Sequence, residues 1–369
     1  MSLAMTTTTT TTTITIGDRR IGAGQPCYTI AELSANHHHS LARAKDLVRA
    51  AADCGADAVK LQTYTPDTMT IASDREPFRI GKGTIWEGKN LHDLYGEAYT
   101  PWEWQPGLKR LAESLGMQCF SSPFDETAVD FLEQMDVPAY KIASFELVDL
   151  ALIRKAAATG KPLIISTGMG TLPEIDEAVR TARDAGAREI ALLKCSSAYP
   201  APASDIQLHG IPQLAATFGV PAGLSDHTLG IAVPVAAVAL GACIIEKHFT
   251  LSRSEPGPDS AFSLEPAEFK AMVDAVRVAE LALGPADGAA VTFGISDAQR
   301  PSMTFRRSLF VVQDVKAGER FTSRNVRCIR PGYGLAPRYM DTVLQRVAAR
   351  DVEAGTPLDW NLLGGPAAE

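Results

Sequence analysis

The sequence predicts a (β/α)8 barrel followed by a small β-rich module. Eight short apolar runs between residues 28 and 248 each end on a polar or charged side chain, and they start about 31 residues apart. That distance fits one strand and one helix, and eight such units close a parallel barrel. Segments with apolar residues at helical spacing lie between the runs, at residues 41–54, 125–135, 174–185 and 266–283. Short strands that alternate with helices favour parallel pairing and right-handed crossovers.

The side chains that end the eight runs can carry charge or make hydrogen bonds. In chain order the runs end at Glu32, at Lys60 with Gln62, at Ser121-Ser122, at Lys141, at Ser166-Thr167, at Lys194, at Ser225-Asp226-His227 and at Glu246-Lys247-His248. Active sites on such barrels gather at the carboxyl ends of the strands. The pattern therefore predicts both the fold and the end of the barrel at which chemistry takes place.

One connection is much longer than the others. About forty residues separate Gln62 from Trp102, and they include several prolines and glycines and Trp86. Loops of this length in compact domains usually have a function. We therefore interpret the segment as a lid or as a wall that selects the substrate, and an insertion without a function is the alternative.

The chain changes character after the last predicted helix. Leu283-Gly284-Pro285 ends that helix, and short β-rich segments with turns follow. The segment Asp314–Gly318 returns 37 residues later as Asp351–Gly355, which predicts two related β units in one compact module. A module of about 65 residues is near the lower limit for independent stability. We expect a disordered threonine-rich tail at residues 1–16, a barrel at 17–285, a linker at 286–303 and the module at 304–369.

The composition excludes several classes of protein. The 369 residues are 46% hydrophobic and 21% charged, as in ordinary globular proteins, and the net charge of −8 argues against non-specific binding to nucleic acid. The six cysteines lack metal-binding spacing, so we expect reduced thiols in the core. The longest apolar stretch, residues 231–245, is too short to span a membrane, and the N-terminus lacks the features of a signal peptide. We expect a cytoplasmic protein.

His227 and His248 are the strongest candidates for metal ligands. They end two consecutive strands, so their imidazoles should lie close together at the rim of the barrel. Neutral imidazoles flanked by carboxylates suit a divalent transition metal with positions left open for a substrate. The alternative is that both histidines only bind backbone groups. Glu32 and Glu146 lie at other strand ends and offer carboxylates to the same cavity.

Lysines and serines at strand ends predict a site for an anion. Ammonium groups supply charge and hydroxyl groups fix orientation, a combination that suits a small phosphorylated molecule. The candidates are Lys60, Lys141 and Lys194 with Ser122, Ser166 and Ser225. A lysine at a strand end could instead form a Schiff base, as in aldolases. Three lysines together with a histidine pair favour the anion site.

Two further patterns are weaker. The three successive histidines His37–His39 cannot all face one point on a strand or a helix, so we place only His37 near the site. Gly168 and Gly170 flank Met169 in a loop whose backbone amides could approach a phosphate. A bare glycine pattern, however, has little specificity.

Seven motifs follow one another along the chain: Ala31–His37, Val59–Thr63, Ser122–Phe124, Tyr140–Ser144, Ser166–Met169, Gly223–Thr228 and Glu246–Thr250. Through these motifs the sequence resembles the sialic acid synthase family, enzymes that condense phosphoenolpyruvate with an N-acylated amino sugar. The C-terminal part is similar to the antifreeze-like (SAF) domain that these synthases carry, with Phe305–Ser308 at its entrance. The likeness covers nearly the whole chain after the threonine tract.

The resemblance implies a role for each candidate residue. His227 and His248 would bind a divalent ion, manganese or magnesium, that polarises the aldehyde of an open-chain sugar. The residues that bind phosphoenolpyruvate would be Lys60, Ser122, Lys141, Ser166 and Ser225, and the catalytic residues would be Glu32, Lys60, Lys141 and Glu146. The sugar would contact Gln62, Asn36, Tyr199, Asp259 and Arg307. Carbon 3 of phosphoenolpyruvate would attack the aldehyde, water would add at carbon 2, and phosphate would leave with cleavage of the carbon–oxygen bond. Glu32 would steer that water or stabilise the cationic carbon.

The resemblance also implies an assembly. Arg307 matches the arginine that the antifreeze-like domain of the family delivers to the N-acyl group of the sugar, usually in the barrel of a partner subunit. We therefore expect a homodimer in which each C-terminal domain is swapped onto the barrel of the other chain.

Within the family, the segments that flank the long connection are most similar to the branch that makes pseudaminic acid from a 2,4-diacetamido-2,4,6-trideoxy-altrose. These segments are Gln62–Asp67, Leu94-Tyr95 and Thr100–Trp104. Two segments depart: His38-His39 stands where the family has small or polar residues and often glycine, and Pro256–Asp259 is more similar to the sialic acid branch. The alternatives are an N-acetylneuraminate or legionaminate synthase, a pyruvate-dependent aldolase, and a sugar- or ice-binding protein.

Overall fold

The computed structural model describes residues 13–284 and 293–367. Contacts within the chain divide it into two compact units, Met1–Ala289 and Ala290–Glu369, and this division falls inside the predicted linker. A 3-10 helix, Asp297–Phe305, begins in that linker and ends two residues beyond it. The residues 285–292, which we predict to begin the linker, lie outside the described part of the chain.

The first unit is built on a closed barrel of eight parallel strands, in the order β10-β3-β4-β5-β6-β7-β8-β9. The strands are β3 Tyr28–Glu32, β4 Ala58–Thr63, β5 Gln118–Pro123, β6 Tyr140–Ile142, β7 Leu163–Ser166, β8 Ile190–Cys195, β9 Ala222–Asp226 and β10 Ile244–His248. Each strand coincides with one of the eight apolar runs. The predicted barrel is therefore confirmed, and the strand ends that carry the polar residues lie together at one end of it.

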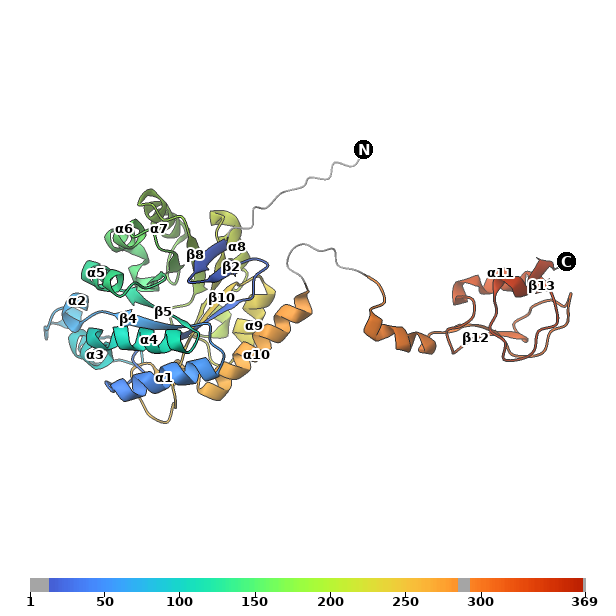
Figure 1. Cartoon of the computed structure of the whole chain (residues 1–369), viewed down its shortest axis with the longest axis horizontal. Helices are drawn as coiled ribbons and strands as arrows, with labels where there is room; N and C mark the ends of the chain where they lie inside the picture. Colours follow the sequence, from blue (N-terminus) through green and yellow to red (C-terminus); the bar gives the residue numbers. More distant parts are fainter. Residues whose placement is uncertain (1–12, 285–292, 368–369) are drawn as a thin grey trace. The chain divides into compact units, whose positions relative to one another are not determined.

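Helices surround the strands (Figure 1) and connect one to the next. They are α1 Leu41–Asp53, α4 Gln105–Ser114, α5 Glu126–Gln134, α6 Leu150–Ala158, α7 Leu172–Asp184, α8 Gly210–Phe218, α9 Ala232–Ala239 and α10 Pro266–Leu283. The four helices predicted from periodicity are confirmed within two residues at each end. In α7, for example, the buried residues Ile175, Ala178, Val179 and Ala182 follow helical spacing, and Thr171 and Glu174 form a capping box at the start.

A short hairpin precedes the barrel, and the sequence analysis missed it. Strands β1 Thr13–Ile16 and β2 Arg19–Gly22 pair antiparallel, so placing residues 13–16 in a disordered tail was wrong. Alternation of threonine and isoleucine explains the strand, because Ile14 and Ile16 face the core together with Ile21 and are fully buried. The rest of the predicted tail, residues 1–12, lies outside the described residues.

The long connection after β4 is folded. It contains α2 Pro66–Met69, α3 Leu91–Ala98 and two 3-10 helices, Glu76–Phe78 and Trp102–Trp104. Its Trp86 donates from Nε1 to the carbonyl oxygen of Pro258 at 2.9 Å and packs on Tyr199, with ring centroids 5.6 Å apart. The connection thereby contacts the loops that follow β8 and β10, as expected for a wall beside the barrel mouth.

The second unit is a β-rich module with its own core. It contains β11 Ser308–Val311, β12 Val326–Ile329, β13 Arg346–Ala348, β14 Leu363–Pro366, the helix α11 Met340–Leu344 and the 3-10 helices Pro337–Tyr339 and Trp360–Leu362. Strands β11 and β12 pair antiparallel, and so do β13 and β14. Leu309, Phe321 and Val343 are among its fully buried core residues.

The repeated segment of the module pairs with its own copy. Val315 and Val352 exchange both backbone hydrogen bonds, at 2.9 and 2.8 Å. Asp314 accepts from the amide of Ala354 at 2.8 Å, and in the same way Asp351 accepts from the amide of Ala317 at 2.9 Å. The repeat seen in the sequence thus reflects two equivalent β units whose aspartates cap each other's turns.

Two expectations about the whole chain concern thiols and membranes. All six cysteines are described and unpaired with one another, and five of them are buried, as expected for cysteines of the core. Among the helices at residues 13–284 and 293–367, none has the length and apolar character that a membrane span requires.

Candidate active site

A network of carboxylates and lysines lies at the carboxyl ends of the barrel strands. Lys60 on β4 forms ion pairs with Glu32 on β3, at 2.6 Å, and with Glu246 on β10, at 3.4 Å. All three side chains are at least 95% buried. Buried charges are tolerated only when they pair with good geometry, so the positions of these three side chains at the mouth are closely constrained. Gln62 and the backbone amide of Ser34 each donate to Glu32 Oε1, at 3.1 and 3.0 Å.

The serines predicted to bind an anion adjoin the same network. Lys60 Nζ donates to Ser122 Oγ at 3.3 Å, and Lys141 Nζ donates to Ser166 Oγ at 2.7 Å. Ser225 donates to Glu246 Oε1 at 3.1 Å, and Lys141 approaches the same oxygen at 3.8 Å. The structure thus brings together all five residues proposed for phosphoenolpyruvate, on strands β4, β5, β6, β7 and β9.

Burial and neighbouring charges shift the acidities of this network in different directions. Burial raises the pKa of Glu32 to about 7, against the opposing effect of Lys60. For Glu246, burial acts in the same direction, but the charges of Lys141 and Lys60 outweigh it and lower the pKa. Burial lowers the pKa of Lys141, although Glu246 opposes it. Two carboxylates whose acidities are pushed apart are typical of sites with one acid or base and one permanent charge.

Glu146 supplies a third carboxylate, from the 3-10 helix Ser144–Val148 that follows β6. Burial raises its pKa to about 7, and the charges of Lys141 and Lys60 reach it. Among the described residues, the buried oxygens Glu146 Oε2 and Glu246 Oε2 have no hydrogen-bond partner. Buried polar atoms are usually satisfied, so these two oxygens indicate places where a ligand donates.

Glu146 should make stability depend on pH. Its folded pKa of about 7 lies above the ordinary value of 4.5, so folding favours the protonated form. The stabilisation is fully present below pH 4.5 and is lost as the pH rises through 7. Between pH 5 and pH 9 the unfolding free energy of the wild type should fall by about 2–3 kcal/mol relative to Glu146→Gln. Denaturant titrations measure this difference. The exposed Glu103→Gln is the control, and equal pH dependence in all three proteins would contradict the prediction.

The two predicted metal ligands are neighbours. The ring centroids of His227 and His248 lie 5.3 Å apart. Nδ1 of His227 donates to the carbonyl oxygen of Ser196 at 2.8 Å, and Nδ1 of His248 lies 3.1 Å from the hydroxyl of Ser34, which itself bonds to Asp259. Hydrogen bonds at Nδ1 orient the rings and direct the lone pair of Nε2 to a ligand, as metal-binding histidines require.

This donor set fits a divalent ion that keeps several open positions. Among the described residues, no group of three or more histidine, cysteine, aspartate or glutamate side chains is arranged to hold a metal. Two imidazoles would therefore leave the remaining coordination positions to oxygens of the substrate or water. Such an open site is typical of metals that act in catalysis rather than in folding.

Aromatic rings enclose the imidazole pair. The centroid of the Tyr199 ring lies 4.4 Å from that of His227 and 5.1 Å from that of Phe262, and Phe262 lies 4.8 Å from His248. Trp86 from the long connection extends this aromatic wall. We did not predict Phe262 or Trp86 as site residues, because a lone aromatic in a loop carries no signal of what it will contact.

The other residues predicted to contact the sugar are placed as follows. Asp259 accepts from the backbone amide of Ala35 at 3.3 Å. The hydroxyl of Ser34 bonds to both Asp259 and His248, so Asp259 is connected to the imidazole pair. Asn36 donates its amide to the Phe249 carbonyl and to Ser263, at 2.9 Å each, so this amide holds two loops together. Arg307 belongs to the second unit, where it is exposed and lies 3.5 Å from the carbonyl of Cys328.

Lys194 does not join the anion site, and its inclusion was wrong. Its aliphatic chain packs against Gly210 at the start of α8, where an added Cβ would lie 3.2 Å from its Cδ. Side chains alternate along a strand, and Lys194 therefore faces the helix layer whereas Cys195 faces the mouth, where its sulfur lies 3.8 Å from His227. A shift of one residue along β8 decides whether a side chain faces the mouth or the helix layer.

The histidine run connects loops. His37 lies 3.0 Å from the Thr100 hydroxyl, and burial lowers the pKa of its ring to about 4. His38 and His39 have φ angles of 49° and 52°, a left-handed conformation that favours glycine. His38 packs against Gly257, where an added Cβ would lie 2.5 Å from its Nε2. The two departures from the family pattern therefore contact each other, and the small residue in one leaves room for the ring of the other.

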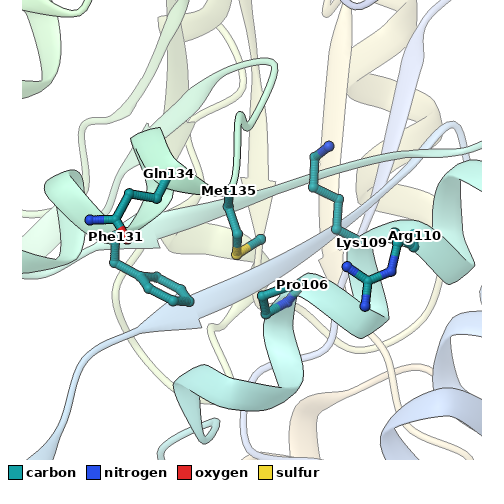
Figure 2. A pocket seen from close by; sticks show the side chains of 6 residues that line it. All are labelled: Pro106, Lys109, Arg110, Phe131, Gln134 and Met135. Atoms are coloured by element: carbon teal, nitrogen blue, oxygen red, sulfur yellow. The ribbon is translucent and has the colours of Figure 1, made fainter.

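A hollow of about 310 Å³ lies between α4 and α5, away from the mouth. Figure 2 shows the side chains that line it: Pro106, Lys109, Arg110, Phe131, Gln134 and Met135. None of these residues ends a barrel strand, and Lys109 already pairs with Glu113 at 2.6 Å. The hollow therefore offers no acid, base or metal ligand comparable to those at the mouth.

The fold and the mouth are those of a barrel enzyme with a buried carboxylate–lysine network beside a pair of imidazoles. Comparison with known families agrees. Residues 47–287 match the NeuB family, and residues 306–364 match the SAF domain. The chain belongs to the NeuB family.

Named relatives lie in several branches of this family. A pseudaminic acid synthase of Helicobacter pylori is 46% identical over 90% of this chain and 97% of its own. An N,N'-diacetyllegionaminic acid synthase of Legionella pneumophila is 37% identical over 92% of this chain and 95% of its own. The crystal structure of an N-acetylneuraminic acid synthetase from Leptospira borgpetersenii has a TM-score of 0.69 and 29% identity, over 79% of this chain and 95% of that chain. The resemblance found in the sequence is thus confirmed.

Proposed function

We propose that this chain is a pseudaminic acid synthase that condenses phosphoenolpyruvate with an open-chain 2,4-diacetamido-2,4,6-trideoxy-altrose, giving pseudaminic acid and phosphate. The observation that carries the proposal is the buried network of Lys60, Glu32 and Glu246 next to the imidazoles of His227 and His248. The choice of sugar is supported by the 46% identity to the Helicobacter pylori enzyme, against 37% to the legionaminic acid synthase.

Lysine and serine side chains would bind phosphoenolpyruvate first. The ammonium groups of Lys60 and Lys141 match the charges of a phosphate and a carboxylate, and Ser122 and Ser166 already bond to these lysines. Ser225 would complete the anion site, from the strand next to Glu246. These donors hold carbon 3 of phosphoenolpyruvate towards the aldehyde of the sugar, so the two reactants meet in a fixed orientation.

A divalent ion, manganese or magnesium, held by His227 and His248 would polarise the aldehyde as a Lewis acid. Carbon 3 would form the new bond to the aldehyde carbon, whose oxygen becomes an alkoxide, and positive charge would develop at carbon 2. Water would add at carbon 2 and give one proton to a carboxylate, which passes it to the alkoxide. The bond between carbon 2 and the phosphate oxygen would then break, so that carbon 2 becomes a ketone and the second proton of the water leaves with the phosphate. Glu32 is suited to hold that water and accept its proton, because burial brings its pKa to about 7. Glu146 would bind hydroxyl groups of the sugar or water bound to the ion.

The sugar would be bound by Gln62, Asn36, Tyr199, Asp259 and Arg307. Tyr199 belongs to the aromatic wall beside the imidazoles, and Asp259 connects to His248 through Ser34. We also propose that the enzyme is a cytoplasmic homodimer and that its SAF domain covers the barrel of the partner chain. The guanidinium of Arg307 is exposed, and its hydrogen bond to the Cys328 carbonyl within the described module is long, at 3.5 Å, which supports a role in such a contact.

Arg307→Ala should raise the Michaelis constant for the sugar at least tenfold and leave that for phosphoenolpyruvate nearly unchanged. A guanidinium that bonds to the N-acyl group of the sugar contributes about 1.5–3 kcal/mol, whereas phosphoenolpyruvate is bound by residues of the barrel. Steady-state phosphate release measures both constants. Arg327→Ala on the neighbouring strand β12 is the control, and a larger effect on phosphoenolpyruvate would place Arg307 elsewhere.

The choice of sugar is tested by phosphate release with three substrates, the 2,4-diacetamido-2,4,6-trideoxy-altrose, its legionaminate counterpart and N-acetylmannosamine. We expect the first to have the highest kcat/KM. The segment Pro256–Asp259, which is similar to the sialic acid branch, makes the other two the relevant competitors. Preference for either of them would refute the assignment to pseudaminic acid. Turnover of pyruvate without phosphate release would instead indicate an aldolase.

A further inference from the structure

Lys247 and Asp226 form a buried ion pair that the proposed reaction does not use. Lys247 Nζ lies 2.5 Å from Asp226 Oδ2, and both side chains are 0% exposed. The two residues are direct partners in the pairing of β10 with β9. Because side chains alternate along a strand, they face the helix layer, whereas Glu246 and His248 face the mouth. The preceding outward pair on the same two strands is apolar, Ile245 opposite Leu224.

The ion pair holds the residues on both sides of His227. Asp226 accepts from the backbone amide of Thr228 at 2.9 Å and from its hydroxyl at 3.0 Å. Lys247 also donates to the carbonyl oxygen of Thr228. His227 lies in the chain between Asp226 and Thr228, which these hydrogen bonds hold in place, and His248 directly follows Lys247. The backbones that carry the two imidazoles are therefore fastened to each other through one ammonium group.

A buried ion pair is a weak source of stability, since its attraction is largely offset by the loss of hydration. An apolar pair such as the preceding Ile245 and Leu224 would fill the same layer without that loss. What an ion pair with three further hydrogen bonds adds is a fixed distance and orientation between β9 and β10. The groups that depend on this geometry are the imidazoles, whose ring centroids lie 5.3 Å apart.

We infer that Lys247 and Asp226 are positioning residues that set the separation of His227 and His248, so that both imidazoles can bind the same divalent cation. The inference rests on the proposed metal site. It assigns a role to side chains that touch neither the cation nor the substrate. Their removal should weaken binding of the cation while the fold and the binding of phosphoenolpyruvate remain.

The test is a titration of the full-length protein with Mn²⁺, followed by the electron paramagnetic resonance signal of the free ion. Wild type, Asp226→Asn, the double variant Asp226→Asn/Lys247→Met and His227→Ala are compared, each with its unfolding temperature. The double variant removes both charges, so it leaves no buried charge unpaired. We expect Mn²⁺ dissociation constants about 10- to 100-fold above wild type in the first two variants, as for other residues that orient metal ligands. The Michaelis constant for phosphoenolpyruvate should stay within about twofold.

Arg277→Met provides the matched control. Arg277 forms an ion pair with Asp57 at 3.0 Å, and Asp57 precedes the barrel strand β4, at the end of the barrel away from the mouth. This variant should lose stability without any change in Mn²⁺ affinity. Wild-type affinity in the folded double variant would overturn the inference. If wild type and His227→Ala bound Mn²⁺ equally, the proposed metal site itself would be wrong. This outcome differs from a failure of the inference about Lys247 and Asp226, because both residues are unchanged in these two proteins.

Discussion

His227→Ala should reduce phosphate release at least 100-fold while the barrel stays folded. The imidazole is one of two ring ligands available to the proposed cation, and its partner His248 cannot hold a divalent ion alone. Without the ion the aldehyde would not be polarised, and attack by carbon 3 of phosphoenolpyruvate would lose electrostatic support. Steady-state phosphate release in the presence of Mn²⁺ measures the loss.

The fold should survive this substitution, because the core of the barrel lies below the mouth and the ring is held by contacts with Tyr199 and Phe262 that an alanine leaves unstrained. Circular dichroism and the unfolding temperature verify this. The exposed His209→Ala is the control for loss of a histidine, and it should keep wild-type activity. Full activity of His227→Ala would remove this residue from the reaction.

Lys60→Met should cost both stability and binding of phosphoenolpyruvate. It leaves Glu32 and Glu246 buried and facing each other without the cation between them, at 2.6 and 3.4 Å in the wild type. Breaking a buried ion pair by removing one partner costs about 3–5 kcal/mol. The same substitution removes an ammonium group from the anion site, so the Michaelis constant for phosphoenolpyruvate should rise at least tenfold.

A second variant separates the two effects. Lys60→Met/Glu32→Gln removes one of the two stranded carboxylates and should recover part of the unfolding free energy without recovering activity. Lys194→Met is the matched control, since this lysine lies one residue before the end of another barrel strand, β8, but faces the helix layer at Gly210. Normal phosphoenolpyruvate binding in Lys60→Met, or an equal defect in Lys194→Met, would contradict the proposed anion site.

The sequence predicted the barrel and the mouth because strand ends carry their own signal. Apolar runs that stop on Glu32, Lys60, Lys141 and Glu246 place these side chains on one rim once the strands are parallel, whatever the loops do. The same geometry brought His227 next to His248, from two consecutive strands. Parallel pairing therefore places residues that are regularly spaced in the sequence next to one another around the rim of the barrel.

Features that depend on contacts between loops could not be predicted. Trp86 reaches Tyr199 and Pro258, which are more than 100 residues away in the chain, and nothing near Trp86 indicates this. His38 and Gly257 compensate each other only because two loops meet. Lys194 shows a different difficulty: the end of β8 was identified to within one residue, but the side chain of Lys194 faces outwards and that of the following Cys195 faces the mouth.

The β1–β2 hairpin was missed for a different reason. A run of threonines made the N-terminal sequence look disordered. Its end is nevertheless a strand with a buried face, because threonines alternate there with Ile14 and Ile16. Two or three apolar residues suffice there, because the hairpin packs on the existing core of the barrel instead of building its own.

The most direct test of the proposed reaction uses phosphoenolpyruvate labelled with oxygen-18 at the oxygen that bridges carbon 2 and phosphorus. With Mn²⁺ and the 2,4-diacetamido-2,4,6-trideoxy-altrose, the enzyme should release phosphate that carries the label, because the bond between carbon 2 and oxygen breaks. Mass spectrometry of the phosphate and of the sugar acid locates the label. Label retained in the sugar acid, or no phosphate release with any of the three sugars, would contradict a site that holds phosphoenolpyruvate on Lys60 and Lys141 for attack by water at carbon 2.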